Sequence, residues 1–293
     1  MLSSQTQCSV CAAGNACGSS SLIPVLCPSG YFCPNGMGQQ PCPGGTYNPF
    51  QGVQSPFGCL VCPPGFYCPS GASVPQPYSK GFYSPFRSVG ESDAFIKCPA
   101  GYPCPSSSQA TYIGTPCDKV CYCPYGSSTT CPNDCPAGTY SDSYIARAVT
   151  DCLPCLEGYY CGQKSTSVDL VRCPAGSYCP LRTATGSIPL CPAGYYRDIV
   201  GGIKPEDCYL CKAGYYCLVG STSPTQNNCP QGYYCPHGTS TANEYPCRAG
   251  TYSNALNIVS QESCLQCGLG NYCPAASTSV IQCVAGTYNN YNY

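Results

Sequence analysis

The chain has 293 residues, among them 32 Cys, 32 Gly, 31 Pro and 27 Tyr but no Trp. Its formal net charge is -1 and only 9% of its residues are charged, so it lacks the basic field with which proteins bind nucleic acid or anionic membranes. Cys and Tyr make up a large part of the 43% of residues counted as hydrophobic, and a single large aliphatic core is therefore not expected.

Cysteine is frequent enough to define the class of protein. At about 11% of the chain it exceeds the level typical of disulfide scaffolds, which form in oxidising compartments. A disulfide that closes a loop of about 15 residues contributes roughly 3 kcal/mol by constraining the unfolded chain, so many such bonds can replace a hydrophobic core. We therefore expect an extracellular or cell-surface protein that is stabilised by disulfides.

The first 41 residues are expected to be a partial repeat. Their start, "MLSSQTQC", lacks the charged and apolar regions of a signal peptide, and no apolar run in the chain approaches the roughly 20 residues of a membrane helix. If the protein is secreted, we expect the sequence to be a mature or partial chain. Within this segment, Cys11 and Cys27 each precede another Cys by six positions.

A long loop begins at Cys42 and recurs along the chain. It opens with the motif C-P-x-G-x-Y and ends at a Cys 17 positions later. A shorter loop, C-x2-G-x2-C, opens in the same way. The long loops run from Cys42 to Cys59, Cys135 to Cys152, Cys191 to Cys208 and, with Arg248 in place of the proline, Cys247 to Cys264. Short loops include Cys62 to Cys68, Cys173 to Cys179 and Cys229 to Cys235.

The shared opening predicts a tight turn. Pro after Cys presets the φ angle for the second position of a type I turn, and Gly three positions after Cys can adopt the left-handed conformation that follows such a turn. The aromatic residue one or two positions later can cover the adjacent disulfide, as we expect of Tyr67, Tyr140, Tyr196 and Tyr234. The glycines predicted to be structural are Gly45, Gly65, Gly138, Gly194, Gly232 and Gly250.

These openings divide the chain into repeats. Six cysteines from Cys152 to Cys191 recur 56 positions later, from Cys208 to Cys247, without a slip. Such self-similarity is typical of arrays in which each unit contacts only its neighbours. The predicted units are a partial repeat at 1–41, a short repeat at 42–77, a variant repeat at 78–134, full repeats at 135–190 and 191–246, a short repeat at 247–282 and the start of a truncated repeat at 283–293.

The variant repeat indicates how the cysteines pair. Tyr78 stands where the opening Cys of a long loop belongs, and Phe95 stands 17 positions later, where the loop should close. Loss of both cysteines together is what a disulfide between these two positions predicts, because a lone survivor would be an unpaired thiol. Cys121 and Cys131 occur only in this repeat and are expected to bond to each other.

Local pairing extends to the short loops, including Cys11 with Cys17, Cys27 with Cys33, Cys98 with Cys104, and Cys117 with Cys123. Fifteen such pairs leave Cys8 and Cys283, whose partners under the 17-residue rule would lie outside the chain, and we expect the sequence to be a window from a longer array. A crossed scheme remains open for the longer repeats. It would pair Cys155 with Cys173 and Cys161 with Cys179, similar to modules of tumour-necrosis-factor receptors.

The expected fold class is one of small disulfide-rich repeats. Frequent Gly and Pro and the absence of a helical apolar period favour short β-hairpins and irregular loops with almost no helix. Because every loop is local in sequence, the repeats are expected to stack along the chain into an elongated, solenoid-like rod.

The motifs "CPAGTYS" and "CPAGSYC", together with C-x2-C after a loop of 17, resemble the ephrin-receptor-like cysteine-rich repeats. Those repeats are widespread in surface proteins of ciliates, algae and other protists, and the resemblance covers Cys8 to Tyr288. It implies an extracellular, disulfide-stapled stalk. Algal flagellar-hair (mastigoneme) proteins carry arrays that look similar, which makes a filament subunit the leading specific interpretation.

Sites for chemistry are weakly indicated. The C-x2-C pairs have the spacing of zinc knuckles, but one member of each follows the loop before it and the other begins the loop after it, so no metal and no cofactor is predicted. His237 is the only histidine, and the same position one repeat earlier is Leu181, which suggests a loop residue and not a catalytic one. The protein is not expected to be an enzyme.

The leading hypothesis is a structural protein of an extracellular filament or cell-surface coat that associates with itself. One alternative is the ectodomain stalk of a receptor that binds a protein ligand, and another is an adhesin that binds glycans through exposed Tyr. No N-x-S/T sequon occurs, and O-linked glycans are expected, if any, at serine clusters such as Ser19 to Ser21, Ser106 to Ser108 and Ser127 to Thr130. Neither nucleic acid nor a membrane segment is predicted.

Overall fold

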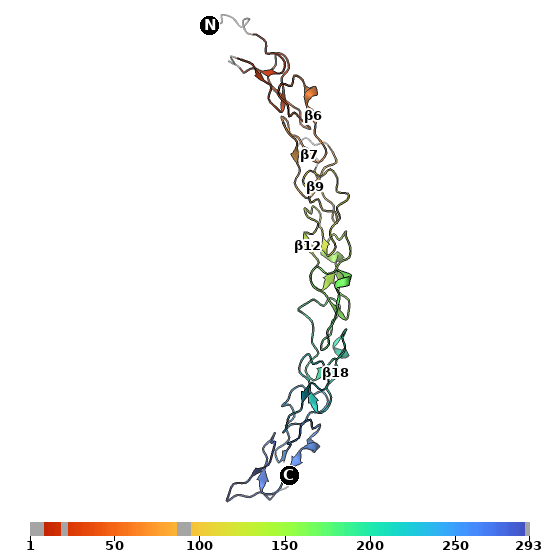
Figure 1. Ribbon diagram of the computed structural model, residues 1–293, viewed down its shortest axis with the longest axis vertical. Helices are drawn as coiled ribbons and strands as arrows, with labels where there is room; N and C mark the ends of the chain where they lie inside the picture. Colours follow the sequence, from red (N-terminus) through yellow and green to blue (C-terminus); the bar gives the residue numbers. More distant parts are fainter. Residues whose placement is uncertain (1–8, 19–22, 87–94, 291–293) are drawn as a thin grey trace. The chain divides into compact units, whose positions relative to one another are not determined.

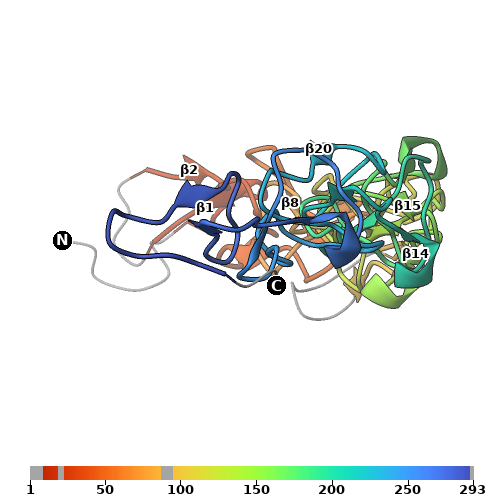
Figure 2. The same cartoon turned by 90° about the horizontal axis from the view of Figure 1, so that it is seen from below.

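The computed structural model describes residues 9–18, 23–86 and 95–290 (Figure 1). Over these ranges the chain forms two-stranded antiparallel hairpins and short 3-10 turns, with no α-helix. Figures 1 and 2 show short arrows joined by irregular loops. The predicted fold class of small disulfide-rich hairpin repeats with almost no helix is therefore confirmed.

Each strand of a hairpin has two residues. The pairs, in chain order, are β1 (Asn15–Ala16) with β2 (Val25–Leu26), β3 (Tyr31–Phe32) with β4 (Gln40–Pro41), β5 (Thr46–Tyr47) with β6 (Leu60–Val61), β7 (Phe66–Tyr67) with β8 (Gln76–Pro77), β9 (Phe82–Tyr83) with β10 (Ile96–Lys97), β11 (Cys121–Tyr122) with β12 (Asn133–Asp134), β13 (Thr139–Tyr140) with β14 (Leu153–Pro154), β15 (Tyr159–Tyr160) with β16 (Val171–Arg172), β17 (Tyr195–Tyr196) with β18 (Tyr209–Leu210), β19 (Tyr215–Tyr216) with β20 (Asn227–Asn228), β21 (Thr251–Tyr252) with β22 (Leu265–Gln266), and β23 (Asn271–Tyr272) with β24 (Ile281–Gln282). The 3-10 turns are η2 (Pro56–Gly58), η3 (Val149–Asp151), η4 (Ser167–Asp169), η5 (Pro205–Asp207) and η6 (Gln261–Ser263).

The chain divides into two compact units. The first contains the residues up to Cys135 together with Ser141–Cys152, and the second contains Pro136–Tyr140 together with the residues from Leu153 onward. Both units are built in the same way, from hairpins that follow one another in chain order.

The elementary repeat of the structure is one hairpin. Each hairpin begins at an opening residue, and successive openings lie 15 to 20 residues apart, as between Cys27 and Cys42 or Cys42 and Cys62. The opening residue usually donates its N–H to the carbonyl of the turn glycine of the hairpin before it; the N–O distance is 3.0 Å from Cys62 to Gly45, whereas Cys135 donates to Val120, whose φ is also positive. The opening residues are Cys11, Cys27, Cys42, Cys62, Tyr78, Cys98, Cys117, Cys135, Cys155, Cys173, Cys191, Cys211, Cys229, Cys247, Cys267 and Cys283. Among the described residues, the loops that follow Cys98, Cys173, Cys229 and Cys283 contain no two-stranded hairpin.

Backbone hydrogen bonds also join most hairpins to the next in both directions. The N–H of Gly194 donates to the carbonyl of Cys217 at 2.8 Å, and in return the N–H of Gly220 donates to the carbonyl of Cys191 at 2.9 Å. The same exchange occurs between the hairpins that open at Cys42 and Cys62. Since buried backbone polar groups must be paired, this exchange fixes how neighbouring hairpins stack within a unit.

The turn glycines are needed for two reasons. Gly194 has a φ of 85°, a conformation that side chains disfavour, and a Cβ there would also clash with the carbonyl oxygen of Gly238. All six glycines predicted from the sequence have φ between 81° and 88°. The close approach of the next hairpin is a requirement that the sequence motif alone does not reveal.

The apolar part of the interior consists almost entirely of cysteine side chains. Among the described residues, the buried apolar side chains are cysteines apart from Ala72, Tyr78, Pro103 and Ala146. The aliphatic residues lie mostly at the surface; for example, Leu210 in β18 is 53% exposed. Disulfides therefore occupy the place of an aliphatic core, as the composition indicated.

Candidate functional site

The feature that recurs through the molecule is the disulfide that closes each hairpin. Nine disulfides join cysteines six positions apart. They are Cys11–Cys17, Cys27–Cys33, Cys62–Cys68, Cys98–Cys104, Cys117–Cys123, Cys173–Cys179, Cys211–Cys217, Cys229–Cys235 and Cys267–Cys273. Four join cysteines 17 positions apart, namely Cys42–Cys59, Cys135–Cys152, Cys191–Cys208 and Cys247–Cys264.

The residue six positions after the opening distinguishes the two kinds of hairpin. In short loops it is the second Cys, whereas in long loops it is a buried polar residue: Asn48, Ser141, Arg197 or Ser253. Its side chain bonds to nearby backbone, as when Nδ2 of Asn48 donates to the carbonyl of Tyr31 at 2.9 Å. The opening Cys of a long loop therefore has no Cys six positions further on, and it forms its disulfide with the Cys 17 positions further on. In the full repeats one long hairpin is followed by two short loops, which produces the 56-residue period.

A 3-10 turn precedes the closing Cys of each long loop, and in two loops an aspartate stabilises it. Oδ2 of Asp207 accepts hydrogen bonds from the N–H groups of Ile203, at 2.7 Å, and Lys204, at 3.2 Å. The bond from Ile203 is the main cause that lowers the pKa of Asp207 below its usual 3.8. Asp151 makes the equivalent bonds to the backbone before Cys152.

In the variant repeat an aromatic pair stands in place of the missing long-loop disulfide. The ring centroids of Tyr78 and Phe95 lie 6.0 Å apart, and the rings of Phe95 and Phe82 meet edge to face at 4.8 Å. Tyr78 is only 2% exposed, but its hydroxyl has no hydrogen-bond partner. A cavity of about 60 Å³ is lined by Tyr78, Ser79, Phe82 and Phe95.

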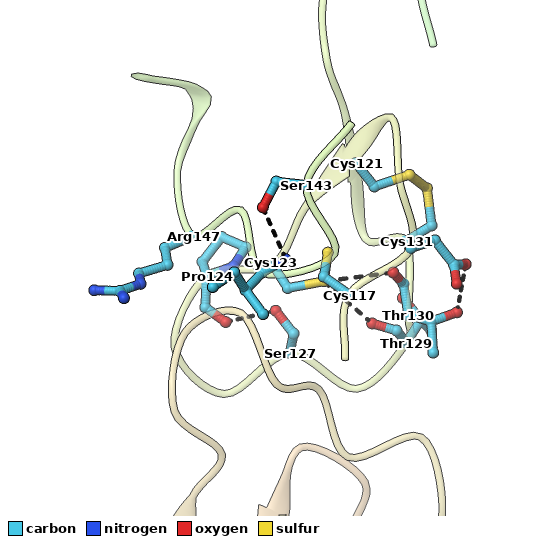
Figure 3. The surroundings of a disulfide bond; sticks show 12 residues. Cys117, Cys121, Cys123, Pro124, Ser127, Thr129, Thr130, Cys131, Ser143 and Arg147 are labelled. Carbon is cyan, nitrogen blue, oxygen red and sulfur yellow. Dashed lines mark hydrogen bonds between the residues drawn. A yellow bond between two sulfur atoms is a disulfide. The ribbon is translucent and has the colours of Figure 1, made fainter. Parts of the chain in front are cut away.

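Cys121 and Cys131 form a disulfide within the same repeat (Figure 3). Oδ1 of Asp134 lies 3.4 Å from the sulfur of Cys131 and 3.9 Å from that of Cys121. Two cysteines and an aspartate this close are potential metal ligands. The sulfurs are bonded to each other, however, and a disulfide offers no thiolate to an ion.

One expected disulfide is missing from the structure. Cys155 and Cys161 open and close a short loop, yet both are free, buried thiols, so the prediction that they pair is wrong here. Burial, together with a hydrogen bond that the Cys161 thiol donates to Cys155, raises the pKa of the Cys161 thiol to about 12, which keeps it protonated near neutral pH. The crossed scheme is also wrong, because Cys173 bonds to Cys179.

Cys283 is a third free cysteine among the described residues. It opens a hairpin of the long type, since Asn289 occupies the position six residues on. The side chain of Asn289 donates to the carbonyl of Asn271 at 2.8 Å, just as Asn48 donates to Tyr31. Cys8, the other cysteine expected to lack a partner, lies outside the described residues.

The remaining predicted residues lie at the surface of the hairpins. His237 is exposed in its loop. Tyr67, Tyr140, Tyr196 and Tyr234, which the sequence predicts to cover the adjacent disulfides, are half-buried. Tyr196 and Tyr234 each pack against a second Tyr of their own hairpin, with ring centroids 6.0 and 5.5 Å apart.

Sequence reasoning missed one feature of charge distribution. Residues 1–79 contain no charged side chain, and all 25 Lys, Arg, Asp and Glu residues begin at Lys80. We call residues 1–79 the uncharged segment; its described parts are 9–18 and 23–79. Several of its large apolar side chains are exposed, above all Phe57 at 96%. Plotting charge along the chain would have revealed it.

Neither a protein-family model nor a curated protein sequence shows a significant match to the chain. No helix among the described residues has the length and apolarity to cross a membrane. The fold and its bridges define the class of molecule. It is a disulfide-stapled repeat protein, and its disulfide density is that of extracellular proteins.

Proposed function

We propose that the protein is a structural component of an extracellular filament or cell-surface coat, in which the array of hairpins acts as a mechanical element. The observation that carries this proposal is that almost every hairpin is closed by its own disulfide and is hydrogen-bonded to the next. Such a chain has cross-links at short intervals along most of its described length.

The bridges limit how far the chain can be extended. Cys42 and Cys59 are 17 positions apart in sequence, but their disulfide holds their Cα atoms 5.8 Å apart. Without the bond, a segment of that length extends to about 55–60 Å. Pulling on the ends of the protein therefore cannot draw out the residues inside a closed loop. The short loops remove further slack in the same way.

The resemblance to ephrin-receptor-like cysteine-rich repeats belongs to this proposal, as does the narrower interpretation of a flagellar-hair-type filament. Both agree with hairpins that repeat along the chain with little chemistry in their loops. The partners in such an assembly are further copies of the protein or another component of the coat.

Immuno-electron microscopy of the native material tests this function. Antibodies raised against the folded chain should label a filament or coat repeatedly along its length. Label confined to isolated sites in the cell membrane would favour the receptor ectodomain and overturn the proposal. Saturable binding of the purified chain to a glycan array, with no labelled filament or coat, would favour the adhesin instead.

A further inference from the structure

The uncharged segment differs from the rest of the molecule in the surface it presents. Leu26 is 60% exposed, Phe50 is 61% exposed, and Leu60 and Val61 of β6 are 42% and 49% exposed. Apolar side chains are exposed elsewhere too, but from Lys80 onward they share the sequence with all 25 charged residues. The uncharged segment is the longest stretch of the chain without a charged residue; the stretches 213–243 and 263–293 are shorter.

These side chains come from adjacent parts of two hairpins. Leu26 lies on β2, and its Cδ2 is 3.4 Å from the place that a Cβ on Gly52 would take. Gly52 belongs to the same long loop as Phe50 and Phe57, and Leu60 and Val61 directly follow the Cys that closes this loop. These residues thus come from one long loop and from the strands next to it, β2 and β6; Figure 1 shows where β6 lies in the chain.

Phe57 is the most exposed of these residues and is held in place firmly. It is the middle residue of η2, in which Gly58 donates to the carbonyl of Ser55 at 3.0 Å and Cys59 donates to that of Pro56 at 3.1 Å. The Cys42–Cys59 disulfide closes the loop around it. The backbone that carries the ring is therefore fixed, and the ring is 96% exposed to solvent.

The other long loops place different residues at this position. Fifteen residues after the opening Cys stand Thr150, Glu206 and Glu262, each in a 3-10 turn that matches η2. The backbone there accepts a polar or charged side chain without difficulty. A large aromatic ring at Phe57 is thus not required by the fold.

We propose that the surface around Phe57 is the contact through which the uncharged segment of one copy packs against the uncharged segment of a second copy. This inference rests on the proposed function, because it names the contact by which the array associates with itself. A charged group that is buried without a partner destabilises a complex, so an apolar, uncharged surface fits best against another without charges. The uncharged segment of this chain is such a surface, and a two-fold pairing would bury Phe57 of both copies near the centre, where aromatic anchors contribute most.

Sedimentation equilibrium of the full chain tests this contact with one variant and one matched control. Phe57→Glu introduces the residue that the chain itself carries at positions 206 and 262. Val168→Glu changes a residue that is 89% exposed in the middle of η4, outside the uncharged segment. We expect the unaltered chain and Val168→Glu to associate equally, and Phe57→Glu to raise the dissociation constant at least about tenfold, as loss of an anchor does. Sodium sulfate should strengthen association, since it favours apolar burial.

Equal association of the unaltered chain and Phe57→Glu would overturn the inference, while the proposed function would still stand on the labelled filaments. A chain that stays monomeric at all concentrations would overturn it as well. So would binding of the monomer to phosphatidylcholine vesicles, which would assign the surface to lipid. Peptide mapping without reduction should find Cys42–Cys59 intact in Phe57→Glu. If it does not, Phe57→Thr, which places there the residue type of Thr150, replaces it as the test.

Discussion

At the scale of single residues, the long loops depend on polar side chains that bond to backbone. Arg197 illustrates this: it is only 9% exposed, and one guanidinium nitrogen donates to the carbonyl of Asp207 at 2.6 Å. It occupies the position that Asn48 and Ser253 hold in other long loops. The carboxylate of Asp207, in turn, accepts from the backbone three and four residues earlier. Both residues act on the few residues before Cys208, where the loop must close.

Asp207 makes part of this stability dependent on pH. Because its folded-state pKa lies below the unfolded value of 3.8, its contribution is present above about pH 4 and is lost as pH falls through the folded pKa. We expect Asp207→Asn, which keeps an acceptor oxygen but removes the charge that the backbone N–H groups stabilise, to destabilise the protein by up to about 1 kcal/mol at pH 7 and by less at pH 3. Denaturant unfolding at both pH values measures this. Glu206→Gln, at the exposed neighbouring position, is the control, and an equal effect in both variants would contradict the prediction.

Two turn glycines allow the cost of a left-handed backbone to be measured separately from the cost of a clash with the next hairpin. Gly194 and Gly201 have φ of 85° and 82°, but a Cβ meets the carbonyl of Gly238 only at Gly194; at Gly201 nothing lies within 4 Å. Ala at Gly201 should therefore destabilise by about 1 kcal/mol, from the left-handed backbone alone. Gly194→Ala should destabilise by more, because the next hairpin must also move. Thermal unfolding of the two variants measures the difference, and equal losses would mean that the hairpin contact contributes nothing.

At the scale of the element, the hairpin accepts more than one closing device. Four long loops use a disulfide with Cα–Cα distances of 5.7 to 5.9 Å, and the long loop of the variant repeat uses the rings of Tyr78 and Phe95. Stacked rings add roughly 1 kcal/mol beyond their burial, whereas a disulfide over such a loop contributes about 3 kcal/mol. The variant hairpin is accordingly less tightly closed than these four.

The double variant Tyr78→Cys/Phe95→Cys should restore the missing bridge. Ser84, six residues after Tyr78, is fully buried like the polar residues of the other long loops, which shows that the position is built as a long-loop opening. We expect a new disulfide and a stabilisation of about 2–3 kcal/mol, measured by peptide mass spectrometry without reduction and by thermal unfolding. Two alkylatable thiols at positions 78 and 95 after air oxidation would show that the backbone there differs from the other loops.

Much of this element could be predicted from the sequence, and the reason is local. Cys, Pro and Gly act within about six to seventeen residues, so Cys42–Cys59 and the left-handed Gly45 follow from spacing and turn chemistry, and Cys121–Cys131 follows because only that repeat contains these two cysteines. The hydrogen bonds between hairpins could not be predicted, because backbone groups carry no sequence signature. For the same reason the sequence reveals the 56-residue repeat but not the single hairpin from which it is built. The free thiols of Cys155 and Cys161 have the same spacing as bonded pairs, and spacing alone does not report oxidation state.

At the scale of the whole molecule, stability depends on sulfur to an unusual degree. Cys, with Ala72, Tyr78, Pro103 and Ala146, forms the buried apolar interior of the described residues, while Leu, Ile and Val lie mainly outside. A protein with an aliphatic core keeps a driving force for folding when its disulfides are reduced. In this protein, reduction would leave neither disulfides nor an aliphatic core. The fold would then depend on the backbone hydrogen bonds between hairpins, and each of these bonds contributes only about 1 kcal/mol net.

Reduction should therefore unfold this protein without heat or denaturant. In dithiothreitol at neutral pH and about 25 °C, we expect the amide N–H groups of the turn glycines, such as Gly194 and Gly45, to lose their protection from hydrogen exchange. The same chain incubated with the oxidised form of the reagent should keep that protection and serves as the control. Exchange followed by mass spectrometry gives the result hairpin by hairpin. The hairpin of Tyr78 and Phe95 has no long-loop disulfide, so its own closing contact should change least on reduction. The neighbouring loops closed by Cys62–Cys68 and Cys98–Cys104 should still lose their protection from exchange. A fully reduced and alkylated chain that retained slow exchange at these glycines would mean that the hydrogen bonds between hairpins, and not the sulfur atoms, hold the structure together.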